Sequence, residues 1–221
     1  MKKALFLSLA AICIFSLSTF AQKGKAKTFE GQISYTIEYL TELDAATKAQ
    51  APTEIIQYFK GNKMRLEQIT AMGKVVVISD QDTKEQVVLI DMMGQKWAIK
   101  STKEETEKAL SETPKATVTV GTETKSIAGY TCTKAEVVTG ESTETFWYTS
   151  DLGLENPNWN MPWSDIKGLL MEYTQTQGEI SSKIVAKEVK KGKQKDTQFT
   201  VPSDYQQMTS QEFQNMFGGG E

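Results

Sequence analysis

The residues that usually carry enzymatic chemistry are unevenly represented in this sequence of 221 residues, which contains no histidine. Without imidazole, the Ser-His and Cys-His nucleophile pairs and the usual near-neutral general base are excluded. A carboxylate pair or a Ser-Lys dyad would still be a workable catalytic device. With 28 acidic residues in the chain, however, a pair such as Glu136 and Glu144 is expected by chance. We therefore expect no catalytic residue and a protein that is not an enzyme.

Metal and cofactor sites have little support in the sequence. The absence of histidine removes the ordinary zinc sites. Asp80 and Asp82 resemble the start of a calcium loop, but Lys84 stands where a third oxygen ligand is needed, so we interpret the segment as a turn. No glycine-rich phosphate loop lies between a strand pattern and a helix pattern. The sequence predicts no metal and no cofactor.

Large apolar side chains give the strongest positive signal for binding. Tryptophan and methionine suit a pliable pocket, but they also fill cores, and core filling is the commoner use of any one such residue. Both interpretations stay open. The candidates for lining a ligand cavity or its lid are Trp97, Trp147, Trp159, Met161, Trp163 and Met171.

The segment from Leu154 to Gly168 favours the pocket interpretation. Its prolines and asparagines resist regular structure, whereas its tryptophans resist exposure to water. We expect a loop or a short helix that covers part of the fold.

Charge and cysteine content limit the class of partner. Two of the 25 basic residues lie in an N-terminal leader described below, which leaves 23 against 28 acidic residues and a net charge of −5. Arg65 is the single arginine, whereas phosphate recognition favours several arginine forks, so nucleic acid is not an expected partner. The chain without its leader keeps one cysteine, Cys132, which is predicted to be buried.

The amino terminus has the layout of a secretory signal peptide. Two lysines precede the apolar run from Ala4 to Leu17, which is too short to span a membrane as a helix. We expect cleavage after Ala21 and a periplasmic or secreted mature chain with no transmembrane segment. Lipidation at Cys13 is the alternative, and it is disfavoured because Ile12 is bulky where the lipoprotein peptidase requires a small residue.

In the segments that must position these residues, apolar residues recur with a period of two, as in a strand, and not with the helical period of 3.6. Ile33 and Tyr35 alternate with polar residues, which predicts a half-buried antiparallel strand. Similar runs follow between turn residues, so we expect about ten strands in one sheet. The sequence predicts a signal peptide at 1–21, a flexible segment at 22–28, a single domain at 29–217 and a flexible tail at 218–221.

Three further segments are assigned from local signals. Thr102 to Pro114 is charged, and it predicts an exposed excursion or a short helix. Thr209 to Glu212 fits a capping box that would start a short C-terminal helix. Gln198 to Val201 predicts a last strand.

Several of these segments also resemble a known family. Lys125 to Cys132, the strand after it and Phe146 to Gly153 resemble the central signature of the DUF4412 family. Phe29 to Ile33 resembles the opening strand of that family, and Phe199 to Tyr205 resembles its closing strand and Pro-x-x-Tyr exit. The GLPGLI family of secreted Bacteroidetes proteins is a sister alternative.

The resemblance implies a fold like that of the periplasmic lipoprotein carriers, whose cavity takes acyl chains. This would be a mainly β (α+β) protein with one strongly curved antiparallel sheet, or unclosed barrel, and a few short helices on its concave face. We therefore expect a non-catalytic protein that binds a hydrophobic or lipid-like ligand in the sheet cavity. Two alternatives remain: an envelope scaffold module that binds a protein partner without a ligand, and a carboxylate-dependent hydrolase.

Overall fold

A computed structural model of the chain describes residues 28–217, and within this range it contains twelve strands in one sheet. The strands are β1 (Gly31–Tyr39), β2 (Glu54–Lys60), β3 (Lys63–Thr70), β4 (Gly73–Asp80), β5 (Gln86–Met92), β6 (Gln95–Ser101), β7 (Thr117–Ile127), β8 (Tyr130–Thr139), β9 (Ser142–Thr149), β10 (Leu169–Gln177), β11 (Ile180–Lys191) and β12 (Gln206–Thr209). The helices are α1 (Ala45–Gln50), α2 (Lys103–Glu112), the 3-10 helix η1 (Asp196–Phe199) and α3 (Ser210–Phe217). The predicted signal peptide and tail lie outside the described residues.

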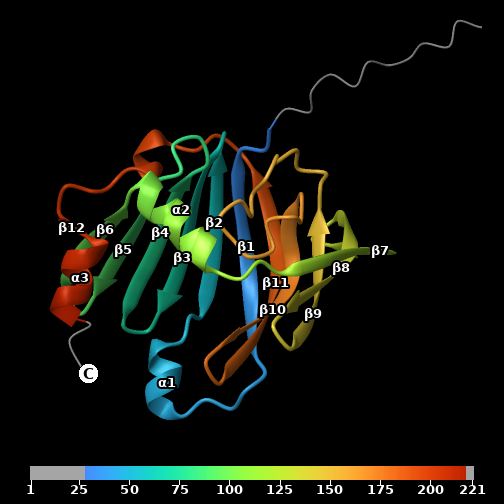
Figure 1. The fold of residues 1–221 in the computed structure, drawn as a ribbon, viewed down its shortest axis with the longest axis horizontal. Coiled ribbons are helices and arrows are strands. Elements are labelled where there is room, and N and C mark those ends of the chain that lie inside the picture. The colour runs from blue at the N-terminus through green and yellow to red at the C-terminus, as the bar shows by residue number, and fades with distance from the viewer. Residues whose placement is uncertain (1–27, 218–221) are drawn as a thin grey trace, which may run out of the picture.

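The sheet consists of two halves joined at β1 (Figure 1). Strand β1 pairs antiparallel with β2 on one side and with β11 on the other. We call β2 to β6 the first wing and β7 to β11 the second wing; in each wing, strands that follow one another along the chain are antiparallel neighbours. The short β12 extends the first wing, in parallel with β6.

The outermost strands, β12 and β7, do not pair with each other, so the sheet stays open. The sequence-based expectation of a mainly β protein with one curved, unclosed and almost wholly antiparallel sheet is therefore confirmed. The sheet has twelve strands where about ten were expected.

Local sequence explains the tight connections between strands. Gly61 and Gly140 adopt positive φ angles of 59° and 60° in the β2–β3 and β8–β9 turns. Glycine reaches this left-handed region without the steric cost of a Cβ atom. Each glycine therefore lets the chain reverse within two residues and start the next strand.

Strand pairing defines a concave face of the sheet. Directly paired residues of neighbouring strands point to the same face. Tyr35 of β1 pairs with Ile55 of β2 and with Ala186 of β11, and all three side chains are buried. Ile55 in turn pairs with Gln68 of β3, which continues the row into the first wing. The strong alternation noted in the sequence of β1 is the cause of this one-sided burial.

Helix α2 crosses in front of the concave face (Figure 1). It connects β6 in the first wing to β7 at the far edge of the second wing. A capping box starts the helix, because the Thr102 amide donates to Glu105 Oε2 at 2.7 Å and the Glu105 amide donates to Thr102 Oγ1 at 3.2 Å. The sequence predicted an exposed excursion or a short helix between Thr102 and Pro114, and the helix is confirmed.

The other two α-helices lie at the margins of the sheet. Helix α1 begins at Asp44, whose carboxylate accepts hydrogen bonds from the amides of Ala46 and Thr47. Helix α3 packs against β6 and β12, and it begins with the predicted capping box, in which the Glu212 amide donates to Thr209 Oγ1 at 3.1 Å.

The convex face of the first wing is covered by residues 196–205, which we call the closing segment. The prediction of a strand at Gln198–Val201 was wrong, because this part of the chain ends the 3-10 helix η1. Phe199 is buried there in a cluster with Val76 and Leu89. A proline follows at position 202, where it cannot donate to a ladder, and this favours irregular structure.

Candidate functional site

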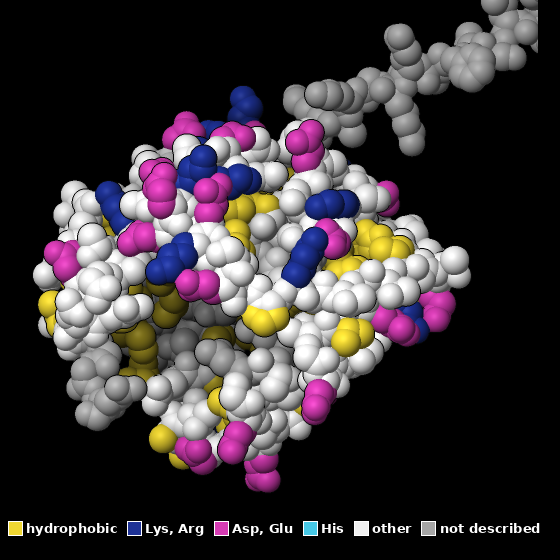
Figure 2. Space-filling view, viewed as in Figure 1, with side chains coloured by type: hydrophobic (Ala, Val, Ile, Leu, Met, Phe, Trp, Pro, Cys, Tyr) yellow, Lys and Arg dark blue, Asp and Glu magenta, His cyan; other side chains and the backbone are white. Residues whose placement is uncertain are grey.

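The concave face is hollow along its centre. Figure 2 shows the hollow below α2, with hydrophobic side chains visible inside it. Two adjoining cavities make up this hollow, which we call the trough.

The larger cavity has a volume of about 560 Å³. Its floor is formed by β1, β2 and β11, and its lower rim by α1 and the β10–β11 turn. The residues around it are Ile37, Tyr39, Thr47, Gln50, Ala51, Pro52, Ile55, Gln68, Thr70, Val75, Met92, Gln175, Gly178, Ile180, Ser182 and Ile184.

The smaller cavity has a volume of about 220 Å³ and lies between the sheet and residues 154–168, which we call the covering segment. Its lining from the sheet comes from β2, β3, β4 and β10, and its lining from the covering segment is Pro157, Asn158, Met161 and Trp163. Ile55, Gln68 and Gln175 line both cavities, so the two spaces meet at these residues.

The covering segment keeps its shape without regular secondary structure. The buried side-chain amide of Asn158 donates to the carbonyls of Ile166 and Gly168, at 2.8 Å each. These bonds satisfy backbone acceptors that a helix or strand would otherwise satisfy. Trp163 packs edge-on against Phe146 of β9, with ring centroids 5.2 Å apart. The segment is therefore a fixed cover and not a loose loop.

The covering segment also ties the two wings together. On the side of the second wing, the Ala116 amide donates to the Pro162 carbonyl at 3.1 Å. On the side of the first wing, the Asn160 side-chain amide donates to Gln86 Oε1 at 3.0 Å. These contacts hold one end of the half-barrel closed.

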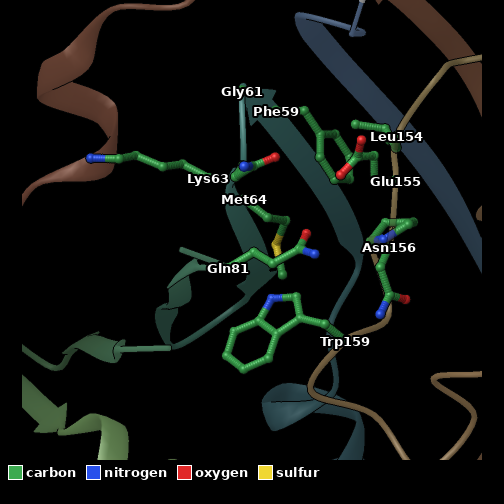
Figure 3. A pocket seen from close by; sticks show the side chains of 11 residues that line it. Phe59, Gly61, Lys63, Met64, Gln81, Leu154, Glu155, Asn156 and Trp159 are labelled. Carbon is green, nitrogen blue, oxygen red and sulfur yellow. The ribbon is translucent and has the colours of Figure 1, made fainter. Parts of the chain in front are cut away.

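Figure 3 shows the closed end in detail. Trp159 faces Met64 and Gln81 there, with Asn156 beside them. The space left between these side chains is about 20 Å³, which is room for a single water molecule. Lys84 lies 4.5 Å from the centre of the Trp159 ring and covers it from the outside. The space on the concave face is therefore nearly filled at Trp159.

A family model described as a domain of unknown function, DUF4412, matches residues 40–205. The chain belongs to the DUF4412 family. The family indicated by the sequence motifs is thus confirmed, although the matched range begins at the end of β1 and leaves out the Phe29 to Ile33 motif.

Solved structures resemble this DUF4412 chain in fold. Two crystal forms of PNGF-II superpose with TM-scores of 0.54 and 0.55, at 17% and 16% sequence identity, and each covers 87% of the chain. The chain spans about a third of PNGF-II, 34% and 33% of its length in the two forms. The Mycobacterium tuberculosis lipoprotein LppX superposes with a TM-score of 0.37 at 10% identity, covering 72% of the chain and 86% of LppX. No curated protein matches the sequence.

Three of the six residues singled out from the sequence of the DUF4412 chain lie in or beside the covering of the trough. Met161 and Trp163 line the smaller cavity, and Trp159 lines the closed end. The structure thus brings together the aromatic residues of the covering segment, which the sequence placed within five positions of each other.

The other three singled-out residues do not line the trough. Trp147 pairs with Glu172, on the face opposite to its neighbours Phe146 and Tyr148, and Lys125 lies 4.3 Å above its ring. Trp97 lies on β6, where it pairs with Gln206 of β12 near the edge of the sheet. Met171 is fully buried in the core, beside a register shift of β10.

Most residues that line the trough were not singled out from the sequence. Ile55, Val75 and Ile184 come from strands that are distant in sequence and meet only through the sheet order. The alternation of β1 identified Ile37 and Tyr39 as one face, and this was the available signal for the floor.

The polar groups of the trough are neutral. The buried Tyr35 hydroxyl donates to Gln57 Oε1 at 2.8 Å, and burial raises the pKa of Tyr35 well above its usual value. Burial likewise raises the pKa of Tyr173, which lines the smaller cavity. Both phenols therefore stay protonated at neutral pH, and they offer hydrogen bonds without charge.

The acidic pair considered from the sequence does not share a face. Glu136 pairs with Thr145, while Glu144 pairs with Val137, so the two carboxylates point to opposite sides of the β8–β9 hairpin. Burial raises the pKa of Glu144, but the carboxylate of Glu136 lies on the other face of the hairpin. Glu136 and Glu144 therefore cannot act together in a hydrolytic mechanism.

Cys132 is a free and fully buried thiol, as the sequence predicted. Burial raises its pKa, which keeps it protonated and weakly nucleophilic at neutral pH. Within residues 28–217, no cluster of three or more Cys, Asp or Glu residues could hold a metal ion. In the same range, no helix is long and apolar enough to cross a membrane.

Proposed function

We propose that this DUF4412 protein is a non-catalytic protein of the periplasm or the extracellular space that binds a hydrophobic ligand in the trough. The observation that carries the proposal is the pair of adjoining cavities of about 560 and 220 Å³ on a largely apolar sheet face. Binding sites for small molecules have volumes of about 300–1,000 Å³ and mostly apolar walls. The space is large enough for an acyl chain or a body of similar size.

The arrangement of the cover supports binding over simple core formation. The covering segment is fixed to both wings at the closed end, yet it leaves the lower part of the same apolar face uncovered. A contiguous apolar surface open to water is costly in a protein without a partner for it. A bound ligand would remove that surface from water.

The chemistry of the chain supports a non-catalytic role. It contains no histidine, the thiol of Cys132 is buried, and Glu136 and Glu144 are on opposite faces. The predicted signal peptide supports localisation in the periplasm or outside the cell.

The experiment compares two tryptophan variants at adjacent positions of β4. Val75 lines the larger cavity, whereas Lys74 points to the convex face beside Glu67. V75W fills the cavity, so we expect it to weaken binding of an uncharged fluorescent naphthylamine dye by about tenfold or more, since tenfold corresponds to about 1.4 kcal/mol. K74W adds the same side chain on the other face, and it should leave binding unchanged.

Circular dichroism establishes that both variants are folded before the titrations are compared. Equal dye binding by V75W and K74W would contradict the proposal, as would the absence of saturable binding by the unmodified chain.

An envelope scaffold module without a ligand is the second candidate, and one observation favours it. Strand β7 has a free edge at the end of the sheet, and Val120 on it is 54% exposed. Free strand edges are templates for pairing with another chain. Crosslinking in the cell envelope that captures a partner at β7, in a protein that binds no dye, would favour this function over ligand binding.

A further inference from the structure

The walls of the trough lack charged side chains. Neither the larger nor the smaller cavity is lined by Asp, Glu, Lys or Arg, although these residues make up 24% of the chain. Other pockets of the described part of the chain do have charged linings. Lys63 and Glu155 line the pocket at the closed end, and Lys115 lines the pocket beside α2. The absence of charge is thus a property of the trough and not of every hollow in the molecule.

Two glutamines stand where the cavities meet. Gln68 lies on β3 in the first wing and Gln175 lies on β10 in the second wing, and both line both cavities. The side chain of Ile55 lies at the same junction. Within the described part of the chain, no protein group is a hydrogen-bond partner of either side-chain amide; Gln68 is half-buried and Gln175 is exposed at the mouth of the junction. Each amide can both donate and accept.

We infer that the ligand is an uncharged amphiphile, with an alkyl chain in the apolar parts of the trough and an ester, amide or hydroxyl group between Gln68 and Gln175. This inference rests on the proposed function and specifies its ligand class. An ionised group inside the trough would lose its water without gaining a counter-ion, which is costly. A neutral polar group instead gains hydrogen bonds from the two amides.

The position of the glutamines supports this orientation of the ligand. They face the trough from opposite wings, so a ligand that passes through the junction meets a neutral polar group on each wall. Alkyl portions on either side of that group would contact Ile37 and Ile184 in the larger cavity and Leu66 and Met161 in the smaller one.

The experiment compares three ligands with the same alkyl length at pH 8 and low concentration: monopalmitoylglycerol, palmitate and hexadecylamine. Each is titrated against the dye-loaded chain, and displacement is measured. We expect monopalmitoylglycerol to bind at least about tenfold more tightly than either charged ligand. Equal affinities for all three would overturn the inference and leave the proposed function intact. If the chain binds neither the dye nor any of the three ligands, the proposed function itself fails.

Two sets of variants test the glutamines. Q68L and Q175L remove the hydrogen bonds but keep the approximate volume, and each should weaken monopalmitoylglycerol about threefold to tenfold, the cost of one neutral hydrogen bond. Q68E places a carboxylate at the junction and should weaken it further. Q32E is the matched control, because Gln32 pairs with Tyr58 on the convex face.

We expect Q32E to bind monopalmitoylglycerol like the unmodified chain. Unchanged affinity in both leucine variants, each shown to be folded by circular dichroism, would overturn the assignment of the polar group to Gln68 and Gln175.

Discussion

The concave and convex faces of the first wing are both apolar, and an irregular segment crosses each of them. On the convex face, the closing segment places Phe199 in a cluster with Val76, Leu89 and Ala98, and three polar contacts fix it along its length. Those contacts are Lys60 to Asp196 at 2.7 Å, Arg65 to the Gln198 carbonyl at 2.8 Å and Lys96 to Asp204 at 2.7 Å. On the concave face, the covering segment is fixed only toward one end of the strands, and a cavity remains beyond it.

Apolar residues on a sheet face therefore do not by themselves indicate a binding site. A segment that follows a convex surface can contact it along its whole length and fill the space with side chains. A segment that bridges a concave surface contacts both walls but leaves the floor between them uncovered. The hollow is therefore a consequence of sheet curvature together with the short reach of the cover.

The largest expected effect is on the free energy of unfolding, from a substitution on the packed convex face of the first wing. F199A should lower the free energy of unfolding by about 3–5 kcal/mol, because it empties a packed site. Binding of the uncharged dye should not change, since Phe199 lies on the face opposite to the trough. Urea denaturation and dye titration measure the two quantities. A loss below about 1 kcal/mol would show that the convex face is less closely packed than the burial of Phe199 indicates.

The covering segment should be sensitive at one internal contact. N158A leaves the buried carbonyls of Ile166 and Gly168 without their donor, so we expect a loss of about 2–3 kcal/mol in unfolding free energy. Proteolysis should also become faster within residues 154–168. Asn156 is the matched control, because its side chain makes neither of these bonds, and N156A should have a smaller effect. Equal loss in both variants would contradict the role of Asn158.

The convex face of the second wing carries the ion pairs of the half-buried Glu172, and its stability should depend on pH. Burial opposes ionisation of Glu172, but hydrogen bonds from Lys125 and Lys183, at 2.7 and 3.2 Å, lower its pKa overall. A lowered pKa stabilises the fold above the unfolded value of about 4.3, and this contribution is lost as the pH falls through the folded pKa. E172Q should therefore cost about 1 kcal/mol at pH 7 and less below pH 4. An equal cost of E172Q at both pH values would contradict this assignment.

The smallest expected effect is that of pH on ligand binding in the uncharged trough. No Asp, Glu or Lys lines it, and its buried tyrosines have raised pKa values. Affinity for an uncharged ligand should therefore change by less than about twofold between pH 5.5 and 8.5, since no lining group titrates there. A titration curve with a midpoint inside this range would reveal an ionisable group that takes part in binding.

The sequence predicted the local features of this molecule better than the long-range ones. Alternation in β1, the capping boxes at Thr102 and Thr209, and the buried Cys132 all depend on residues close together in the chain. The sequence of Gln198–Val201 alternates, and so a strand was wrongly predicted there. Its conformation depends instead on the burial of Phe199 against the convex face of the sheet.

The candidate site was predicted only in part for the same reason. Trp163 and Met161 were identified because their segment combines prolines with large apolar residues. Trp147 was misleading, since the face to which it points depends on the pairing of β9 with β10. Gln68 and Gln175 carried no signal, because the order of the strands alone brings them to one place.

In the proposed function, the concave face holds a ligand that the convex face cannot hold. Crystals grown with a bromine-labelled monoacylglycerol test it most directly, because anomalous scattering locates the bromine independently of the protein phases. We expect the signal within the trough, near Ile55 and between Gln68 and Gln175 or beyond them toward Met161. A trough filled by its own side chains, or bromine bound only outside it, would contradict ligand binding on the concave face.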